Sequence, residues 1–372
     1  MRNDSDPAST VSHACVPLAL ANDLKKILIS RGWLLEGNKP TRAGELICFP
    51  LAPAGRTPDT QTILEELLPE VTFQDFLPQK PAWTRPRTLA EALRGYLPRE
   101  LEVLLPKSWD IMGTVAVIEG PKDPAPELDP FWGNIGQAVV LVNPAVQSVF
   151  LKESAVQGEF RTRALRCIAG PDITETIYKE NDCMFKLDVR KVFFTPRLVT
   201  ERARVASLPP TEDELVFDMF AGVGPFAIER AKAQGVPVIA ADKNPAAIYY
   251  LEQNVVANRV AHLVTPVCAD AATVGEWPLD TVSRRASRVI MNLPERSLEF
   301  VPQAVLALRP EGGILHIYQF CQGEDVTDNA VQQVREALQA INATLEGVIN
   351  AKIVKPYAPH EFLTVVDALV TP

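Results

Sequence analysis

The sequence contains no run of 18 apolar residues, although 47% of its 372 residues are hydrophobic. A helix that crosses a bilayer needs about 20 predominantly apolar residues, so we expect no membrane span. The N-terminal stretch MRNDSDPASTVSHACVPLAL has polar residues where a signal peptide needs an unbroken apolar segment. These absences predict a cytoplasmic protein, and the length and composition are typical of two or three domains.

Cysteine is sparse and scattered, with residues at positions 15, 48, 167, 183, 268 and 321. No Cys-x-x-Cys pair is present, so the spacing predicts neither a structural zinc site nor a disulfide framework. We therefore expect reduced thiols and no bound metal.

The net charge of −9 argues against indiscriminate binding to nucleic acid. The charge is uneven, because residues 152–204 carry 11 Lys and Arg against 8 Asp and Glu. This segment can contact phosphates, although a solvated surface of mixed charge explains it equally well.

The order of apolar and polar segments divides the chain into four parts. Residues 1–55 combine a helical spacing with a short strand, and the proline-rich residues 56–87 are typical of a linker. Residues 88–194 mix one helix with several strand-like runs, which indicates an α+β middle domain. Over residues 195–372 strands and helices alternate, as in a parallel sheet covered by helices.

The stretch VFDMFAGVGPFAIERAKAQG is typical of a chain that approaches a nucleotide. Asp218 ends an apolar strand, and Gly222 and Gly224 let the backbone turn tightly beside a ligand. Asp242 ends the next strand, where an acid accepts hydrogen bonds from ribose hydroxyls, and Asp270 ends the third, where a carboxylate can face adenine. Because neither G-x-G-x-x-G nor a phosphate loop is present, the pattern favours S-adenosylmethionine over NAD. In the alternative, Asp242 only caps the helix that follows it.

The fourth strand of this region ends in IMNLPE. Asn292 offers an amide, and Pro294 forces the preceding backbone to be extended, so carbonyls and the Asn oxygen can hold a planar amine. Methyltransferases that act on exocyclic amines place an aromatic residue where this chain has Glu295, which counts against that class. A plain strand-to-loop turn is the alternative.

Six stretches carry a more specific signal. They are PKSWDIMGTVAVIEG, GEFRTRALRCIAGPDITETIYKEN, FKLDVRKVFFTPRLVTERARVA, DMFAGVGPFAI, MNLPERSLEF and GGILHIYQF. Together they resemble the archaeal and eukaryotic tRNA (guanine-37-N1)-methyltransferase family. The similarity covers residues 100–320 well and residues 20–52 more faintly.

The resemblance implies a class I, Rossmann-like methyltransferase domain, preceded by an α+β middle domain and a small N-terminal α+β domain. It implies S-adenosylmethionine as the methyl donor and N1 of the guanine immediately 3′ of the anticodon as the target. In this family the small domain touches the tRNA elbow, and the other two clasp the anticodon stem-loop. We therefore expect tRNA as the partner, without an obligate protein partner.

Guanine N1 carries a proton at neutral pH, so a base must remove it as the methyl group is transferred. By resemblance, that base is the acid of PRLVTE, Glu201, and general-base catalysis contributes about 10²- to 10⁴-fold. Arg197 would share a face with Glu201 if this segment is helical, and would then contact the nucleotide or the carboxylate of the donor. From the residues alone, Glu201 could instead pair with Arg197 or Arg204 on a surface helix.

Negative charge builds on O6 as N1 loses its proton, so a nearby cation stabilises the transition state. The family uses an arginine of GEFRTR, and we assign Arg161, with Arg163 as the alternative. Asn292 and the carbonyl of Pro294 would grip the guanine edge. The donor site that the resemblance implies consists of Arg197, Asp218, Phe220, Gly222, Gly224, Asp242, Asp270 and Asn292.

Three aromatic residues, Tyr178, Phe193 and Phe194, could stack on an extruded base, although a core position is their more ordinary explanation. His316 lies in an apolar strand and is expected to be a hydrogen-bonded core residue. Two rival functions remain. One is a wybutosine-pathway enzyme that transfers the aminocarboxypropyl group of the same donor; the other is a catalytically silent tRNA-binding protein, which the intact donor-site residues disfavour.

Overall fold

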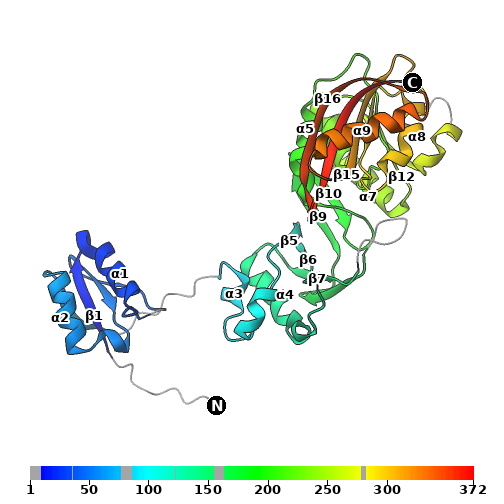
Figure 1. Cartoon of the computed structure of the whole chain (residues 1–372). Coiled ribbons are helices and arrows are strands. Elements are labelled where there is room, and N and C mark those ends of the chain that lie inside the picture. The colour runs from blue at the N-terminus through cyan, green and yellow to red at the C-terminus, as the bar shows by residue number, and fades with distance from the viewer. Residues whose placement is uncertain (1–9, 36, 77–85, 122, 155–162, 278–281) are drawn as a thin grey trace. The chain divides into compact units, whose positions relative to one another are not determined.

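The computed structural model describes residues 10–35, 37–76, 86–121, 123–154, 163–277 and 282–372, in two compact units, Met1–Arg85 and Pro86–Pro372 (Figure 1). The first unit is an antiparallel sheet of order β2-β3-β1-β4 with two helices. Its elements are β1 (Val11–Pro17), α1 (Ala21–Ser30), β2 (Thr41–Ala43), β3 (Leu46–Pro50), α2 (Pro58–Leu67) and β4 (Thr72–Phe76).

The segment 56–87, which the sequence suggests is a linker, contributes α2 and β4 to this unit. Pro58 occupies the first turn of α2, where a proline costs no hydrogen bond. Thr57 caps the same helix, because its hydroxyl accepts the Thr60 N–H at 3.3 Å. Proline density therefore marks a helix start here as well as a connection.

Cys15 and Cys48 form a disulfide between β1 and β3. The two residues are opposite each other in the antiparallel register, and both are fully buried. Our expectation of reduced thiols is wrong for this pair. The separation of 33 residues gives no sign of the pairing, because only the register of the two strands brings the sulfur atoms together.

The second unit begins with a mixed sheet of order β5-β6-β7-β8, against which α4 packs through Ile135 and Val139. A separate hairpin, β9 with β10, follows. The elements of this part are α3 (Leu89–Ala92), β5 (Trp109–Met112), β6 (Val115–Ile118), α4 (Trp132–Val142), β7 (Ser148–Lys152), β8 (Leu165–Ala169), β9 (Glu175–Glu180) and β10 (Cys183–Asp188).

The rest of the second unit is a seven-stranded sheet of order β13-β12-β11-β14-β15-β17-β16. Strands β11 to β15 run parallel, and β17 and β16 add antiparallel strands at one edge. The elements are α5 (Val199–Ser207), β11 (Val216–Asp218), α6 (Pro225–Gln234), β12 (Val238–Asp242), α7 (Pro245–Ala257), β13 (Val264–Cys268), β14 (Arg288–Met291), α8 (Val301–Ala307), β15 (Gly313–Gln322), α9 (Val326–Gln339), β16 (Thr344–Ala358) and β17 (Glu361–Thr371).

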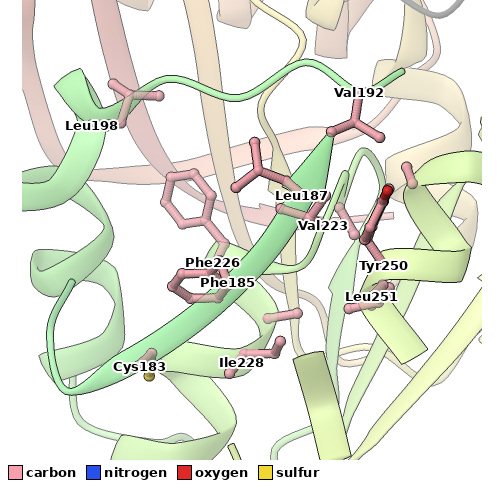
Figure 2. Packing of buried hydrophobic residues seen from close by; sticks show 14 of the residues in the cluster. Cys183, Phe185, Leu187, Val192, Leu198, Val223, Phe226, Ile228, Tyr250 and Leu251 are labelled. Atoms are coloured by element: carbon pink, nitrogen blue, oxygen red, sulfur yellow. The ribbon is translucent and has the colours of Figure 1, made fainter. Parts of the chain in front are cut away.

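Apolar clusters cover both faces of the large sheet. On one face, Phe185 and Leu187 of β10 pack with Phe226 of α6 and Leu251 of α7 (Figure 2). The other face holds α8 and α9. Side chains that alternate along β11 enter the two clusters in turn. The predicted fold, a Rossmann-like methyltransferase sheet preceded by α+β parts, is confirmed.

Of the helices in the described ranges, none is long and apolar enough to cross a membrane. Over the same ranges, no group of three His, Cys, Asp or Glu residues is arranged to hold a metal ion.

Candidate active site

Four polar side chains follow the carboxyl ends of adjacent parallel strands. Asp218 ends β11, Asp242 ends β12, Asp270 lies two residues beyond β13, and Asn292 directly follows β14. Strand β11 has β12 on one side and β14 on the other, so the direction of the strand order reverses here. Open parallel sheets bind ligands at such switch points.

The loop after β11 is shaped by Gly222 and Gly224, whose φ angles of 56° and 93° lie in the left-handed region. The Gly222 N–H donates to Oδ2 of Asp242 at 2.8 Å, and the Asn244 N–H donates to Oδ1 at 2.8 Å. Asp242 therefore ties the glycine loop to the start of α7. The helix cap itself is Asn244, whose Oδ1 accepts the Ala246 N–H.

Burial raises the pKa of both strand-end acids. Loss of hydration raises the pKa of Asp218 to about 7, and the charge of Asp242 contributes to the shift. The pKa of Asp242 is also raised by burial, against the hydrogen bonds from Asn244 and Gly222. A cationic ligand above these strands would favour the ionised form of both groups.

A first pocket of about 510 Å³ opens over these strand ends, a volume typical of small-molecule sites. Phe220 packs edge-to-face on Phe300 at 5.0 Å and gives the pocket an apolar wall. Carboxylates of Asp242 and Asp270 supply hydrogen-bond acceptors, and the glycine loop exposes backbone. This combination fits an adenosyl ligand with a cationic centre, because the acids can accept ribose hydroxyls and the aromatic wall can enclose the purine.

A second pocket of about 850 Å³ lies beside the first. The β5–β8 sheet, the loop after β10 and the end of β16 contribute to its walls. Its cationic residues are Lys152, Arg163, Arg197 and Lys355, and four residues line both pockets: Phe193, Phe194, Thr195 and Glu295. The two pockets are therefore neighbours with a common wall, which permits a ligand in one to react with a ligand in the other.

Glu201 is buried in α5, and its carboxylate faces the interior. Its Oε1 accepts hydrogen bonds from Arg204 at 2.6 Å and from the Tyr318 hydroxyl at 2.9 Å. Lys352 lies 2.8 Å from Oε2. Glu201 is not part of the lining of either pocket, whereas Leu198 and Arg202 of the same segment line the first.

Arg197 and Glu201 do not share a helical face. Arg197 belongs to a 3₁₀ turn, Pro196–Leu198, that precedes α5, and its Nε donates to Asp110 at 2.6 Å. It lines the second pocket and not the first. Of the two arginines considered for O6, Arg163 lines the second pocket, and Arg161 lies outside the described residues.

Asn292 lines the first pocket, but the carbonyl of Pro294 is engaged elsewhere, because it accepts the Phe320 N–H at 3.3 Å. Phe194 packs against Tyr178 at 5.2 Å and under the Arg202 guanidinium at 5.3 Å. Phe194 is thus both packed and pocket-lining, Phe193 also lines both pockets, and Tyr178 lines neither.

A buried polar network, which no motif of the sequence indicates, extends from Glu201. Arg204 joins Glu201 to Asp367 at 2.6 Å, and Asp367 lies 2.6 Å from Nδ1 of His316. His316 also accepts from Arg288 at 2.8 Å, and burial lowers the pKa of its ring. The expectation that His316 is a hydrogen-bonded core residue is confirmed. No periodic signal reveals such a network, since its members come from four separate elements, α5, β14, β15 and β17.

Comparisons with known proteins agree with this geometry. The TRM5/TYW2 methyltransferase domain family matches residues 176–346, and the TYW2 N-terminal domain family matches residues 89–174. The chain is 40% identical over 287 residues to the tRNA (guanine(37)-N(1))-methyltransferase Trm5b of Pyrococcus abyssi, covering 77% of this chain and 81% of that protein. This chain belongs to the TRM5/TYW2 methyltransferase family.

Two further members of the TRM5/TYW2 family are similar to most of this chain. The tRNA(Phe) (4-demethylwyosine(37)-C(7)) aminocarboxypropyltransferase of Pyrococcus horikoshii is 31% identical over 286 residues, 77% of this chain and 97% of that protein. A solved complex of aTrm5 and tRNALeu is similar in structure, with a TM-score of 0.72 and 30% identity over 96% of this chain and 99% of that one. The family uses S-adenosylmethionine, and solved TYW2 structures contain AdoMet or MeSAdo.

Several pocket residues were not singled out from the sequence. In the first pocket these include Arg202, Lys243, Asn244 and Phe300; in the second they include Lys152, Lys355 and Tyr357. Asn244 carried a usable signal, because Asn-Pro two residues after the strand-end Asp242 is typical of a helix start. The others reach the pockets through tertiary packing.

Proposed function

We propose that this chain transfers the methyl group of S-adenosylmethionine to N1 of guanosine 37 in tRNA, the nucleotide 3′ of the anticodon. The supporting observation is the wall that the two pockets share, formed by Phe193–Thr195 and Glu295. In this proposal the donor occupies the first pocket and the guanine enters from the second. The 40% identity to a named guanine-37-N1 enzyme favours this reaction over others of the family.

The residues of the first pocket would hold the donor by complementary chemistry. Asp242 would accept hydrogen bonds from the ribose hydroxyls, Asp270 would face the adenine, and Gly222 would let the backbone approach, in a turn that Gly224 shapes from outside the lining. When bound, S-adenosylmethionine supplies a methyl group on a sulfonium, which is already electrophilic. Asn292 would then orient the guanine edge, since positioning of two reactants is a large part of such catalysis.

We keep Glu201 as the proposed acceptor of the N1 proton, with one structural condition. Its carboxylate is held by Arg204, Tyr318 and Lys352, so it must turn toward the pockets when tRNA binds. The start of α5 is close enough for this, because Leu198 and Arg202 line the first pocket. Arg163 would stabilise the charge that develops on O6.

The decisive experiment uses donor labelled separately on its methyl group and on its aminocarboxypropyl tail. The purified protein is given a tRNA transcript with G37 and, as a control, the same transcript with A37. We expect only the methyl label to be transferred, to N1 of G37, with none on A37. Transfer of the tail, or methylation at another atom, would overturn the proposal.

The tail transfer is the second candidate function. This chain is 31% identical to the aminocarboxypropyltransferase and covers nearly all of that protein. Residues 89–174 also match the TYW2 N-terminal domain family, and both observations favour transfer of the tail. The two reactions differ in which carbon bound to the sulfonium faces the acceptor. The double-label experiment therefore separates them directly.

The role of Glu201 is tested by Glu201→Gln. The amide keeps the size of the side chain but cannot accept the proton as a carboxylate does, so we expect single-turnover methylation at saturating donor to fall at least about tenfold. Donor affinity, measured by calorimetry, should be unchanged. Glu311→Gln, at an exposed position, is the matched control. An unchanged rate in Glu201→Gln would exclude Glu201 as the base.

The wider setting of the reaction is also proposed. We assign a cytoplasmic location and tRNA as the partner, without an obligate protein partner. We also keep the elbow-binding part (1–55), joined by α2 and β4 of the segment 56–87 in one unit, the RNA-binding middle domain (88–194) and the methyltransferase domain (195–372).

A further inference from the structure

The hairpin of β16 and β17 reaches the second pocket with its turn-proximal end. Lys355, Pro356, Tyr357 and Ala358, which we call the hairpin tip, line that pocket. The hairpin tip lies beyond residue 346, where the match to the methyltransferase domain family ends. It therefore adds a wall that the family match does not cover.

Lys355 brings a poorly compensated positive charge to this wall. Among the cations of the second pocket, Lys152 is paired with Glu119 at 3.0 Å and Arg197 with Asp110 at 2.6 Å. Within the described residues, Lys355 has no carboxylate within 4.0 Å. Burial, and then the charge of Arg197, lower its pKa against an opposing effect of Asp110, so its ammonium is partly desolvated and incompletely compensated. Such a group is stabilised by an anionic ligand.

Tyr357 brings an aromatic surface to the same wall. The centre of its ring lies 4.1 Å from that of Phe320, with the two planes tilted by 31°. Nevertheless 58% of Tyr357 is exposed, so a ring held in place from one side remains accessible. Phe320 is in turn fixed to the strand-end loop, because its N–H donates to the Pro294 carbonyl.

The order of these contacts connects the hairpin tip to the proposed reaction centre. The loop that carries Asn292 and Pro294 is bound to Phe320, and Phe320 carries Tyr357. A single-stranded RNA segment offers the two matching groups, since its bases have π-faces and its phosphodiesters carry full negative charges. A neutral guanine offers Lys355 only a carbonyl dipole, which compensates a partly buried ammonium less well.

We infer that the hairpin tip is a further RNA-binding element, on which Tyr357 stacks with a base and Lys355 pairs with a phosphate of the strand that carries the target nucleotide. This inference rests on the proposed function, because it requires tRNA in the second pocket. It assigns both residues to binding of the substrate and not to the proton transfer itself.

The test measures binding of G37 transcript by the full-length protein at several salt concentrations, with single-turnover rates at saturating tRNA. Lys355→Met should weaken tRNA binding about tenfold and reduce the slope of log affinity against log salt by about 0.7 to 1. Tyr357→Leu, which keeps an apolar cover on Phe320, should weaken binding about tenfold with the slope unchanged, and Tyr357→Phe should bind like the wild type. Arg335→Met, at an exposed position on α9 outside both pockets, is the control for loss of a surface cation.

Two outcomes would overturn the inference. One is an unchanged affinity and salt slope in Lys355→Met; the other is a slower reaction at saturating tRNA with unaltered affinity, which would place the lysine in the chemical step. Neither outcome depends on which group of the donor is transferred, because the affinity for tRNA is measured directly. A wild type that binds tRNA but modifies another atom would defeat the proposed function and leave the hairpin tip assigned.

Discussion

Two buried acids, Glu180 and Glu229, lie against one arginine next to the first pocket. Arg202 Nε is 2.6 Å from Glu180 and 3.8 Å from Glu229, and Asn181 donates to Glu229 at 2.8 Å. Burial, with the charge of Glu180, raises the pKa of Glu229 from 4.5 to about 8. The pKa of Glu229 is therefore higher in the folded state than in the unfolded state, so protonation of its carboxyl group favours folding. The resulting contribution to the free energy of unfolding is complete below a pH of about 4.5 and is lost as the pH rises toward 8.

We therefore predict that Glu229→Gln increases the free energy of unfolding at pH 8 by on the order of 2 kcal/mol and changes it little at pH 5. The amide is neutral at both values and can still accept the bond from Asn181. Urea unfolding at the two pH values measures the difference. The control Glu229→Ala removes the bond and leaves a cavity, so it should destabilise at both. An equal effect of Glu229→Gln at pH 5 and pH 8 would contradict the assignment.

The position of a single residue in the site could be predicted from the sequence only where it depends on the residues next to it in the chain. Asp242 and Asn292 line the first pocket because a strand end fixes the position of the residue there, whereas Asp218, also predicted from a strand end, is buried and lines neither pocket. Glu201 was assigned by resemblance, and the structure adds what no local pattern contains: Lys352 and Tyr318, more than 100 positions away, hold its carboxylate. Partners so far apart in the chain determine how the charge of Glu201 is compensated, and the spacing of residues in the sequence does not reveal them.

At the scale of elements, the turn from β11 into α6 requires its glycine. Gly224 has a φ of 93°, and a Cβ there would lie 2.3 Å from Cδ1 of Leu251. We predict that Gly224→Ala weakens donor binding at least about tenfold and lowers the free energy of unfolding by about 1–3 kcal/mol, because of backbone strain and displaced side chains.

Gly235→Ala, at the end of α6, is the matched control. Gly235 has a φ of 68°, but the space that a Cβ would occupy there is open. This variant should cost about 1 kcal/mol and leave donor affinity unchanged, as calorimetry would show; equal losses of affinity in both variants would refute the role of the turn.

The elements themselves were predictable where their pattern is strong. The alternation of strand and helix after residue 195 identified the parallel sheet, because buried parallel strands are apolar throughout. The linker assignment over 56–87 did not anticipate α2 and β4, since proline both interrupts chains and starts helices. The hairpin tip was not anticipated either: β16 alternates exposed and half-buried residues and has four register shifts, so its sequence shows no clean period.

At the scale of the whole molecule, the two compact units make a prediction about unfolding. The disulfide Cys15–Cys48 lies within the first unit, Met1–Arg85, and closes a loop of 33 residues. Such a cross-link stabilises by about 3–4 kcal/mol by restricting the unfolded chain, and its loss should affect only the unit that contains it. We predict two thermal transitions by calorimetry, of which dithiothreitol lowers one. S-adenosylmethionine should raise the temperature of the other transition, because the first pocket belongs entirely to Pro86–Pro372.

The double variant Cys15→Ser, Cys48→Ser should reproduce the effect of the reductant. Cys321→Ser, at a free buried cysteine of the second unit, is the control and should make neither transition sensitive to the reductant. A single transition that responds to both reagents would mean that the units unfold as one, and the stability of the donor site would then depend on the redox state of a pair of thiols in the other unit.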